Sequence, residues 1–403
     1  MGVKKNIGIL FPVSRKMGVF QYAMSIAEAL INSNEDFNYT ILYFGQESPK
    51  DFLKIKNVSH VRFISLDASP NHFLSKMNFF FNCFLGYPFF TTNKKNKEIL
   101  KNVNIDLLII PFQLMFGFEH NIPYIVSIPD VMWKYYPNFP EYTLLKRIKL
   151  NFVVHYCTKY SLLNVVDAST GFSDLVTFYH VPEKKIKIIP YIPPGYIYEF
   201  KDMSKESATT LLLKYHLPEK FIFYPAQFWF HKNHLRLIET LKIIKEEKNA
   251  KINLVLVGNP GANNENYKKV MDLVKELSIE DQIFHLGYVT DKEIVALYKK
   301  STALVFPTLI GPTSIPPLEA MTLGIPVLCS NLFSMPEEVG DAGMLFNPFN
   351  PMDMAEKIYK VWSDESLREK MVIKGYEKMN DLNLEKYAKM WIMAVKEGLD
   401  KIG

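Results

Sequence analysis

Short, mostly apolar runs alternate with stretches of helical periodicity along this chain, and the whole alternation occurs twice. Runs of this kind are typical of parallel strands that helices cover on both faces. The pattern therefore restricts the fold class to α/β with mainly parallel sheets. The expected strands are 6–11, 39–44, 61–66, 105–110, 124–128, 165–169 and 185–189 in the first set, and 221–225, 252–257, 283–286, 303–306 and 326–329 in the second.

The two sets are separated at Pro190-Tyr191-Ile192-Pro193-Pro194-Gly195, where three prolines and a glycine are typical of a linker. Helical patterns connect the strands at 18–31, 233–247, 267–277, 291–299 and 315–322, and they fill most of 352–401. We expect two Rossmann-like doubly wound domains, residues 1–195 and 196–382, that face a central cleft. Residues 383–403 are expected to form a helix that packs back toward the N-terminal domain.

The composition is that of an ordinary globular protein and excludes several classes of function. The 403 residues are 48% hydrophobic and 22% charged, and the net charge of +5 is too small to indicate nucleic-acid binding. Cys83, Cys157 and Cys329 lie too far apart for a metal or disulfide framework, which favours a reducing cytoplasm. No apolar run reaches the ~18–20 residues of a membrane span, and the N-terminus lacks a signal-peptide pattern. We therefore expect a cytoplasmic protein that is at most bound to a membrane surface.

One strand-to-helix connection carries a turn of small residues, Gly311-Pro312-Thr313-Ser314, followed by Ile315-Pro316-Pro317-Leu318-Glu319. The beginning of a helix offers free N–H groups and a partial positive charge, which suit a phosphate or diphosphate. The turn therefore indicates a site for a nucleotide-activated substrate.

A second connection of the same type follows the expected strand 221–225 and contains His231-Lys232-Asn233-His234. Lys232 is placed at the carboxyl end of the sheet, where a lysine can neutralise a diphosphate leaving group. The alternative is a solvated surface lysine. His231 and His234 have no nearby carboxylate or cysteine to complete a metal site, so we interpret them as ordinary polar residues of the loop.

These segments occur in order with Leu286-Gly287-Tyr288-Val289 and with Gly324-Ile325-Pro326-Val327. As a set they resemble the retaining glycosyltransferases of the GT-B fold in glycosyltransferase family 4. The resemblance lies mostly in residues 221–347. In the N-terminal half, Gly18 near the first helix and Asp130 in Ser127-Ile128-Pro129-Asp130 resemble acceptor-side landmarks of that family.

The resemblance implies roles for particular residues. Glu319 matches the second acid of the family's Glu-x7-Glu element and would hold the ribose of the donor; the alternative is an exposed helix glutamate. Lys232, Glu319 and Asp130 are the expected catalytic residues. Donor contacts are expected from Gln227, Lys232, Tyr288, Val289, Thr313, Ser314, Ile315 and Glu319, although Val289 can equally be plain core.

Three polar groups of the family pattern are absent from this chain. Gly311 stands at the position of the first acid, Gln227 at that of the usual arginine, and Pro129 at that of the histidine before Asp130. We interpret these differences as a divergent branch with its own donor contacts. A chain that has lost catalysis is the alternative.

The function implied is retaining transfer of a sugar from a nucleotide sugar to a glycan or lipid-linked glycan in cell-surface polysaccharide assembly. The chain has no Asp-x-Asp motif, so we expect no metal and no cofactor, with Lys232 and helix N–H groups facing the leaving diphosphate. Two alternatives stay open: a catalytically silent GT-B-like scaffold, and a GT-B nucleotide-sugar epimerase.

Phenylalanines and lysines are interleaved in residues 71–104, and Lys146, Arg147 and Lys149 add further positive charge. Such a mixture suits contact with anionic lipid headgroups at the inner face of a membrane. The alternative is a helix with aromatic core residues and solvated lysines.

Overall fold

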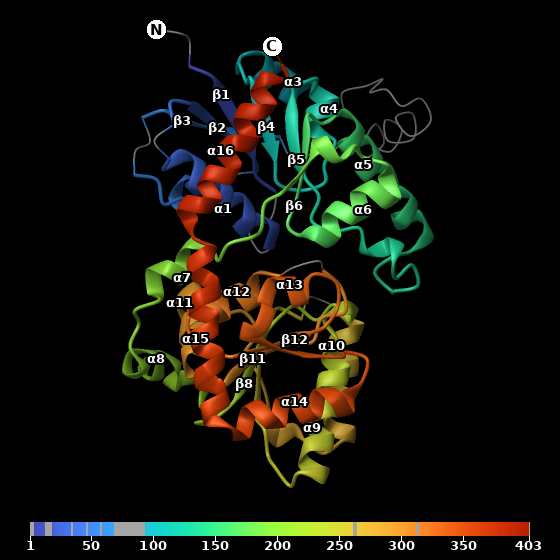
Figure 1. Cartoon of the computed structure of the whole chain (residues 1–403), viewed down its shortest axis with the longest axis vertical. Helices are drawn as coiled ribbons and strands as arrows, with labels where there is room; N and C mark the ends of the chain where they lie inside the picture. The colour runs from blue at the N-terminus through green and yellow to red at the C-terminus, as the bar shows by residue number, and fades with distance from the viewer. Residues whose placement is uncertain are drawn as a thin grey trace. The chain divides into compact units, whose positions relative to one another are not determined.

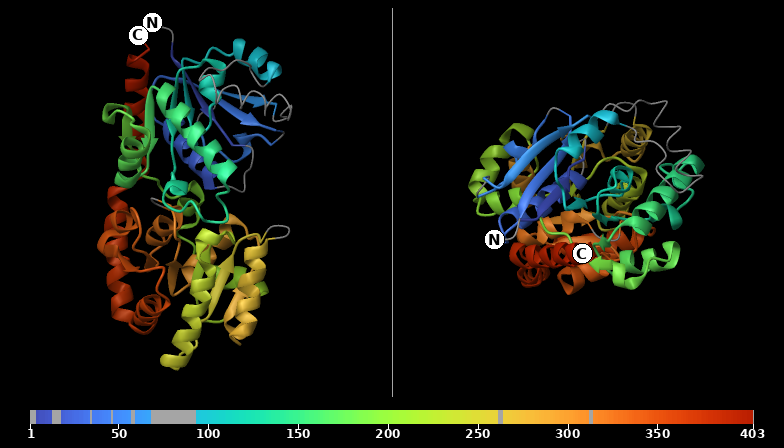
Figure 2. Two further views of the ribbon diagram at one scale, coloured as in Figure 1. Left: turned by 90° about the vertical axis from the view of Figure 1, so that its right-hand side faces the viewer. Right: turned by 90° about the horizontal axis from the view of Figure 1, so that it is seen from above.

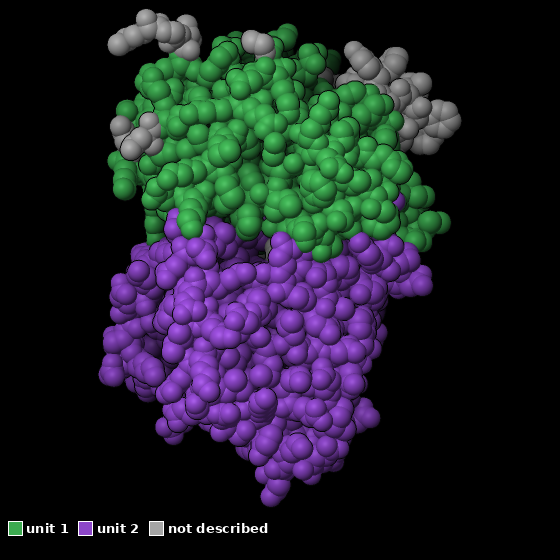
Figure 3. All heavy atoms as spheres, viewed as in Figure 1, with its two compact units in different colours: residues 1–131, 144–190, 384–403 green, residues 132–143, 191–383 purple. Residues whose placement is uncertain are grey.

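The computed structural model describes residues 4–12, 18–33, 35–45, 47–56, 59–67, 93–260, 264–311 and 314–402. Contacts divide the chain into two compact units, coloured separately in Figure 3. Unit 1 comprises Met1–Val131, Leu144–Pro190 and Leu384–Gly403, and unit 2 comprises Met132–Thr143 and Tyr191–Asn383. The change of unit in the linker falls between Pro190 and Tyr191, and the segment Met132–Thr143 also belongs to unit 2.

In the described part of unit 1, seven parallel strands form a sheet in the order β3-β2-β1-β4-β5-β6-β7 (Figure 1). The order reverses its direction between β1 and β4, which is the mark of a doubly wound sheet. The strands are β1 (Asn6–Leu10), β2 (Asn38–Phe44), β3 (Val61–Leu66), β4 (Leu107–Ile110), β5 (Tyr124–Ser127), β6 (Leu163–Val166) and β7 (Ile186–Ile188).

The helices of unit 1 are α1 (Gly18–Ile31), α3 (Lys94–Lys101), α4 (Phe116–His120), α5 (Leu144–Tyr160), α6 (Ser169–Tyr179) and α16 (Leu384–Asp400). The last helix, α16, packs against α1 and against β4 and β5 (Figure 2). Its Tyr387 and Trp391 are fully buried, and Gly398 lies where a Cβ would press on Leu107 and Ile125. Burial of these large rings fixes the end of the chain on unit 1.

In the described part of unit 2, six parallel strands form a second sheet in the order β10-β9-β8-β11-β12-β13. Here the order reverses between β8 and β11, so the expected doubly wound α/β class is confirmed in both units. The strands are β8 (Ile222–Pro225), β9 (Leu254–Val257), β10 (Ile283–His285), β11 (Ala303–Phe306), β12 (Val327–Ser330) and β13 (Gly343–Phe346).

Side-chain caps define where several helices of unit 2 begin. Thr290 and Glu293 form a capping box at α11, and Asn264 accepts hydrogen bonds from the first turn of α10. The helices are α7 (Gly195–Phe200), α8 (Lys205–Leu212), α9 (His234–Glu247), α10 (Glu265–Glu276), α11 (Asp291–Lys300), α12 (Ile315–Thr322), α13 (Met335–Val339), α14 (Pro351–Ser363) and α15 (Glu365–Asp381).

Candidate functional site

Two loops leave the sheet of unit 2 where its strand order reverses, one after β8 and one after β11. In open α/β sheets the ligand crevice lies at this point. The β8 loop ends in the short 3-10 helix Phe230–Lys232, in which the Lys232 N–H donates to the Trp229 oxygen at 3.0 Å. Asn233 follows with φ 60°, a left-handed conformation that asparagine tolerates better than most residues.

Hydrogen bonds fasten the β8 loop to the β11 loop. The His231 oxygen accepts from the Leu309 N–H at 2.8 Å and from the Thr308 hydroxyl at 3.3 Å. The buried Asn233 side chain donates to the Pro307 oxygen at 3.1 Å and to the Pro348 oxygen at 2.8 Å. The two loops at the reversal point therefore form one rigid wall rather than two independent turns.

Lys232 lies at the strand-to-helix turn where the sequence places it. Its Nζ is 5.4 Å from the centre of the Phe306 ring, and its backbone oxygen accepts from the buried Tyr224 hydroxyl at 2.8 Å. A cation over an aromatic face is attracted by the ring, so this contact helps to hold the Lys232 side chain at the end of β11. Its assignment to a leaving diphosphate stays a prediction.

A carboxylate that sequence reasoning missed is paired with the residue before Lys232. Glu141 Oε1 accepts from the His231 backbone N–H and lies 3.1 Å from His231 Nδ1. Both side chains are largely buried, with 11% of the Glu141 side chain and 17% of the His231 side chain exposed. Burial alone would raise the pKa of Glu141, but the hydrogen bonds from His231 outweigh it and hold the pKa below its ordinary value. The pair thus favours a negative Glu141 that accepts from the His231 backbone N–H.

The first turn of α12 offers fewer N–H groups for a phosphate than we expected from the sequence. Pro316 and Pro317 lack an N–H, so their positions in the first turn contribute no donor. The Ser314 N–H is already bonded to Glu338 Oε2 at 2.7 Å. Ile315 begins the helix, and Thr313 lies outside the described residues. A diphosphate at this turn would meet Ile315 directly and would compete with Glu338 for Ser314.

Gly311, at the position of the family's first acid, has φ +110°. An L side chain is disfavoured at this backbone angle, and a bulky one is strongly disfavoured. A glutamate at this position would therefore need a different backbone angle.

The predicted ribose ligand, Glu319, is 5% exposed and is not the solvated helix glutamate of the alternative interpretation. Its two oxygens accept from the Tyr196 hydroxyl at 2.6 Å and from the Tyr298 hydroxyl at 2.7 Å. Burial raises the pKa of Glu319 above its ordinary value, and the two hydroxyls oppose part of that rise. A ribose diol would have to replace at least one tyrosine, so the ribose role stays a prediction.

The other predicted donor residues lie in different environments. Gln227 follows β8, and its Oε1 accepts from the Trp229 indole N–H at 2.8 Å. Tyr288 is 68% exposed after Gly287, which has φ +69°. Val289 is 5% exposed and belongs to the hydrophobic core of unit 2. Of Tyr288 and Val289, only Tyr288 has a side chain open to solvent.

The predicted acceptor-side residues Gly18 and Asp130 belong to unit 1. Gly18 is the exposed first residue of α1, and Asp130 is half-buried beyond β5. Most of the aromatic–basic segment 71–104 lies outside the described residues, which resume at Asn93. Across the described part of the chain, no three side chains of the metal-binding kinds (His, Cys, Asp, Glu) come together, and no helix there has both the length and the apolar character to cross a bilayer.

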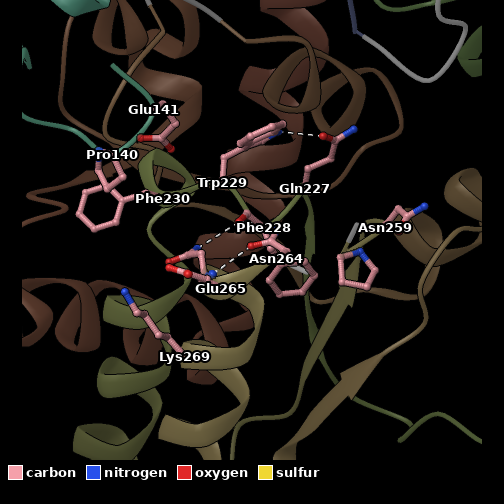
Figure 4. Close-up of a pocket in the computed structure, with 12 residues that line it drawn as sticks. Pro140, Glu141, Gln227, Phe228, Trp229, Phe230, Asn259, Asn264, Glu265 and Lys269 are labelled. Carbon is pink, nitrogen blue, oxygen red and sulfur yellow. Dashed lines mark hydrogen bonds between the residues drawn. The ribbon is translucent and has the colours of Figure 1, made fainter. Parts of the chain in front are cut away.

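A pocket of about 450 Å³ adjoins the β8 loop within unit 2 (Figure 4). It is lined by Pro140 and Glu141, by Gln227 to Phe230, and by residues of 259–269. The volume is in the range of small-molecule sites, about 300–1,000 Å³. Of the predicted donor residues, Gln227 is the one that lines it.

The fold is similar to that of several solved structures. The crystal structure of Alr3699/HepE from Anabaena, in complex with UDP and glucose, matches with a TM-score of 0.76 over 97% of this chain and 99% of that one, at 14% identity. A glycosyltransferase from Rickettsia africae matches with a TM-score of 0.72 over 98% and 99%, at 17% identity. At such identities the likeness establishes the fold, which is that of the GT-B glycosyltransferases.

Residues 214–378, which lie in unit 2, match the family described as "Glycosyl transferases group 1". The serotype-specific mannosyltransferase WbdA of Escherichia coli is 28% identical over 270 residues, which cover 64% of this chain and 33% of WbdA. The O-antigen chain mannosyltransferase B of Escherichia coli is 28% identical over 236 residues, 58% of this chain and 60% of that protein. The chain thus spans only a third to three fifths of these curated relatives.

Proposed function

We propose that this protein transfers a sugar from a nucleotide sugar to a glycan acceptor, with retention of configuration, in the assembly of a cell-surface polysaccharide. The observation that carries the proposal is the fastened pair of loops at the strand-order reversal of unit 2, with Lys232 at their turn. The relatives named as O-antigen and serotype-specific mannosyltransferases support this class of reaction and make mannose the first sugar to test.

In the proposed reaction the bond between the sugar C1 and the phosphate oxygen breaks, and a bond from C1 to an acceptor oxygen forms. The sugar gains oxocarbenium character, and negative charge develops on the leaving nucleoside diphosphate. Lys232 faces that charge, while the acceptor proton passes to the leaving phosphate oxygen. Asp130 is proposed to orient the acceptor hydroxyl. No cofactor is assigned, and metal-independent chemistry is part of the proposal.

Charge neutralisation at the leaving group is commonly the largest single catalytic contribution. The chain has Gln227 where the resembled family has an arginine, so less positive charge is available on the β8 loop. His231, held against Glu141, is the nearest replacement along that loop. We assign Lys232 the main role and His231 a supporting one.

The test compares Lys232→Ala with wild type for binding and turnover of a panel of nucleotide sugars that begins with mannosyl donors. We expect kcat to fall about 10²–10³-fold, the usual loss when one such group is removed. Lys248→Ala, an exposed lysine just beyond α9, is the matched control and should keep full activity. Equal turnover in Lys232→Ala and wild type would reject the site. Donor binding without turnover in wild type would favour the silent scaffold, and epimerised donor would favour the epimerase.

We also propose that unit 1 contacts the inner, anionic face of a membrane, where a lipid-linked acceptor would lie. Helix α5 exposes 64% of Leu144, 80% of Leu145 and 52% of Ile148, and these alternate with Lys146, Arg147 and Lys149. Exposed leucine and isoleucine beside cations suit insertion at a negatively charged headgroup layer, with about 1 kcal/mol from each basic side chain near the surface.

Flotation with vesicles of phosphatidylcholine, with and without phosphatidylglycerol, tests this surface. We expect binding to the anionic vesicles that weakens with salt, and at least a tenfold loss in Leu145→Glu. Ile373→Glu, which places the same charge at an exposed isoleucine of α15, is the control and should bind as wild type does. Equal binding of Leu145→Glu and wild type would exclude α5 as the contact.

A further inference from the structure

The pocket beside the β8 loop has a rigid aromatic floor. Phe228 is 1% exposed, stacks on the His234 ring at 4.4 Å and meets the edges of Tyr267 and His285. Its backbone oxygen accepts from the side-chain amides of Asn264 at 3.2 Å and Asn266 at 3.1 Å. The floor is therefore fixed by packing and by hydrogen bonds, as a preformed ligand site requires.

A solvent-exposed tryptophan, Trp229, lies at the rim of the pocket. Trp229 is 50% exposed, and its indole N–H donates to Gln227 Oε1 at 2.8 Å, so the ring has a fixed orientation (Figure 4). Tryptophan is usually well buried, and an exposed, oriented indole provides a flat apolar surface with little conformational entropy left to lose. The C–H face of a pyranose ring is a flat apolar surface of matching size.

Polar side chains on the first turns of α10 complete the lining. Glu265 and Lys269 make no ion pair or hydrogen bond within the described residues, and no donor there reaches Asn266 Oδ1. These groups can pair with hydroxyls, which both donate and accept. The charged lining groups are Glu141, Glu265 and Lys269, so the pocket has no excess of positive charge for a diphosphate.

We propose that this pocket binds a neutral pyranose unit of the glycan acceptor, with Trp229 under the ring and α10 side chains on its hydroxyls. The inference rests on the proposed function, because it assumes that the chain acts on glycans. It adds a subsite within unit 2 that meets the contacts predicted for the donor at Gln227. The same turn joins this subsite to the chemistry, since the Lys232 N–H donates to the Trp229 oxygen.

Kinetics of Trp229→Ala and Asn266→Ala test the subsite in the full chain. We expect the KM for a mannose oligosaccharide acceptor to rise about tenfold or more, while hydrolysis of the donor without acceptor stays within twofold of wild type. Trp229→Phe, which keeps a smaller aromatic face, should recover most of the loss. Ile373→Ala is the control for truncation of an exposed apolar side chain. An unchanged acceptor KM in Trp229→Ala would overturn the inference.

Binding alone separates this inference from the proposed reaction. Saturation-transfer NMR with an α-linked mannose disaccharide should show contact to wild type and at least a fivefold weaker effect in Trp229→Ala, even if no donor is ever turned over. If a nucleoside such as guanosine or uridine displaces the disaccharide at this site, the pocket belongs to the donor base and the inference is wrong. Absence of disaccharide contact in wild type would also overturn it.

Discussion

Replacing Tyr298 with phenylalanine removes one of the two hydroxyls that hold Glu319. The Tyr298 ring is fully buried and lies edge-on against Phe223 at 5.0 Å, so phenylalanine can keep the packing. What is lost is the 2.7 Å hydrogen bond to Glu319 Oε2, which leaves one oxygen of a carboxylate that is 5% exposed without that donor. The substitution therefore isolates the hydrogen bond from the hydrophobic contact.

The expected cost is about 2–3 kcal/mol of unfolding free energy, because a hydrogen bond to a charged group contributes about 1.5–3 kcal/mol and the abandoned oxygen stays buried. For a unit of about 200 residues this corresponds to a fall in Tm of roughly 4–12 °C. Tyr215→Phe makes the same change at Glu293, where the 3.0 Å bond from the Tyr215 hydroxyl is lost but Thr290 and Lys214 still contact the carboxylate. We expect less than about 1 kcal/mol there.

The cost should depend on pH in a defined direction. Burial raises the pKa of Glu319 in the folded state, so the folded state binds a proton more readily than the unfolded state above about pH 4.5. Stability is therefore lost as the pH rises from that value through the folded pKa. Removing the Tyr298 hydroxyl raises this pKa further, since that hydroxyl favours the charged form. The difference between Tyr298→Phe and wild type should be small near pH 4 and reach its full size by pH 8.

Urea unfolding at pH 4, 6 and 8, followed by circular dichroism, measures these differences. In a Glu319→Gln background, Tyr298→Phe should cost only about 1 kcal/mol at every pH, as expected for a neutral hydrogen bond. If Tyr298→Phe and Tyr215→Phe shift the midpoint equally at pH 8, Glu319 is not held as the structure shows. A cost that grows toward low pH would contradict the assigned direction of the pKa.

Two further substitutions test the packing of unit 2. His234 is 1% exposed, neither ring nitrogen makes a well-formed hydrogen bond among the described residues, and burial lowers its pKa to about 3. His234→Phe should therefore raise the free energy of unfolding by about 1 kcal/mol at pH 7. The gain should grow as the pH falls below 6.5, because the wild-type unfolded state then binds a proton that the folded state does not bind. A gap in urea midpoint that does not widen between pH 7 and pH 5 would contradict this. Gly258 has φ +159°, and an added Cβ would run into the backbone oxygen of Ala226. Gly258→Ala should therefore lower the free energy of unfolding by about 1–3 kcal/mol more than Gly287→Ala, which has φ +69° and open space around it. Equal costs in thermal unfolding would contradict the contact.

The sheets were predictable because short apolar runs between helical patterns have few other solutions in a chain of this size. The residues at which the strands begin and end were harder to predict. The run 105–110 forms a strand only from Leu107, since the Asp106 carboxylate accepts from the Asn6 N–H at 2.8 Å and ends the regular pattern. The strand Gly343–Phe346 was not predicted, because a four-residue segment that begins with glycine has a weak strand signal.

Within the candidate site, local features were predictable and distant contacts were not. The strand-to-helix turn around Lys232 followed from sequence, and Pro316-Pro317 could have indicated that α12 offers few N–H groups. The Glu141–His231 pair joins residues 90 positions apart, and Tyr196 is 123 positions from Glu319. No periodicity or spacing connects such residues, because the contacts depend on how Met132–Thr143 and α7 pack into unit 2.

The contacts around the β11 loop bear on why this chain has Gly311 where the resembled family has an acid. A simple loss of function would leave a family-like turn with one side chain removed. Here the turn has a φ of +110° at Gly311, its Ser314 N–H is bonded to Glu338, and His231 beside it is paired with Glu141. These described contacts hold both ends of the turn, and the glycine permits the backbone angle. Under the proposed function, the positive charge that faces a leaving diphosphate is therefore expected from Lys232, on a loop that several hydrogen bonds hold in place.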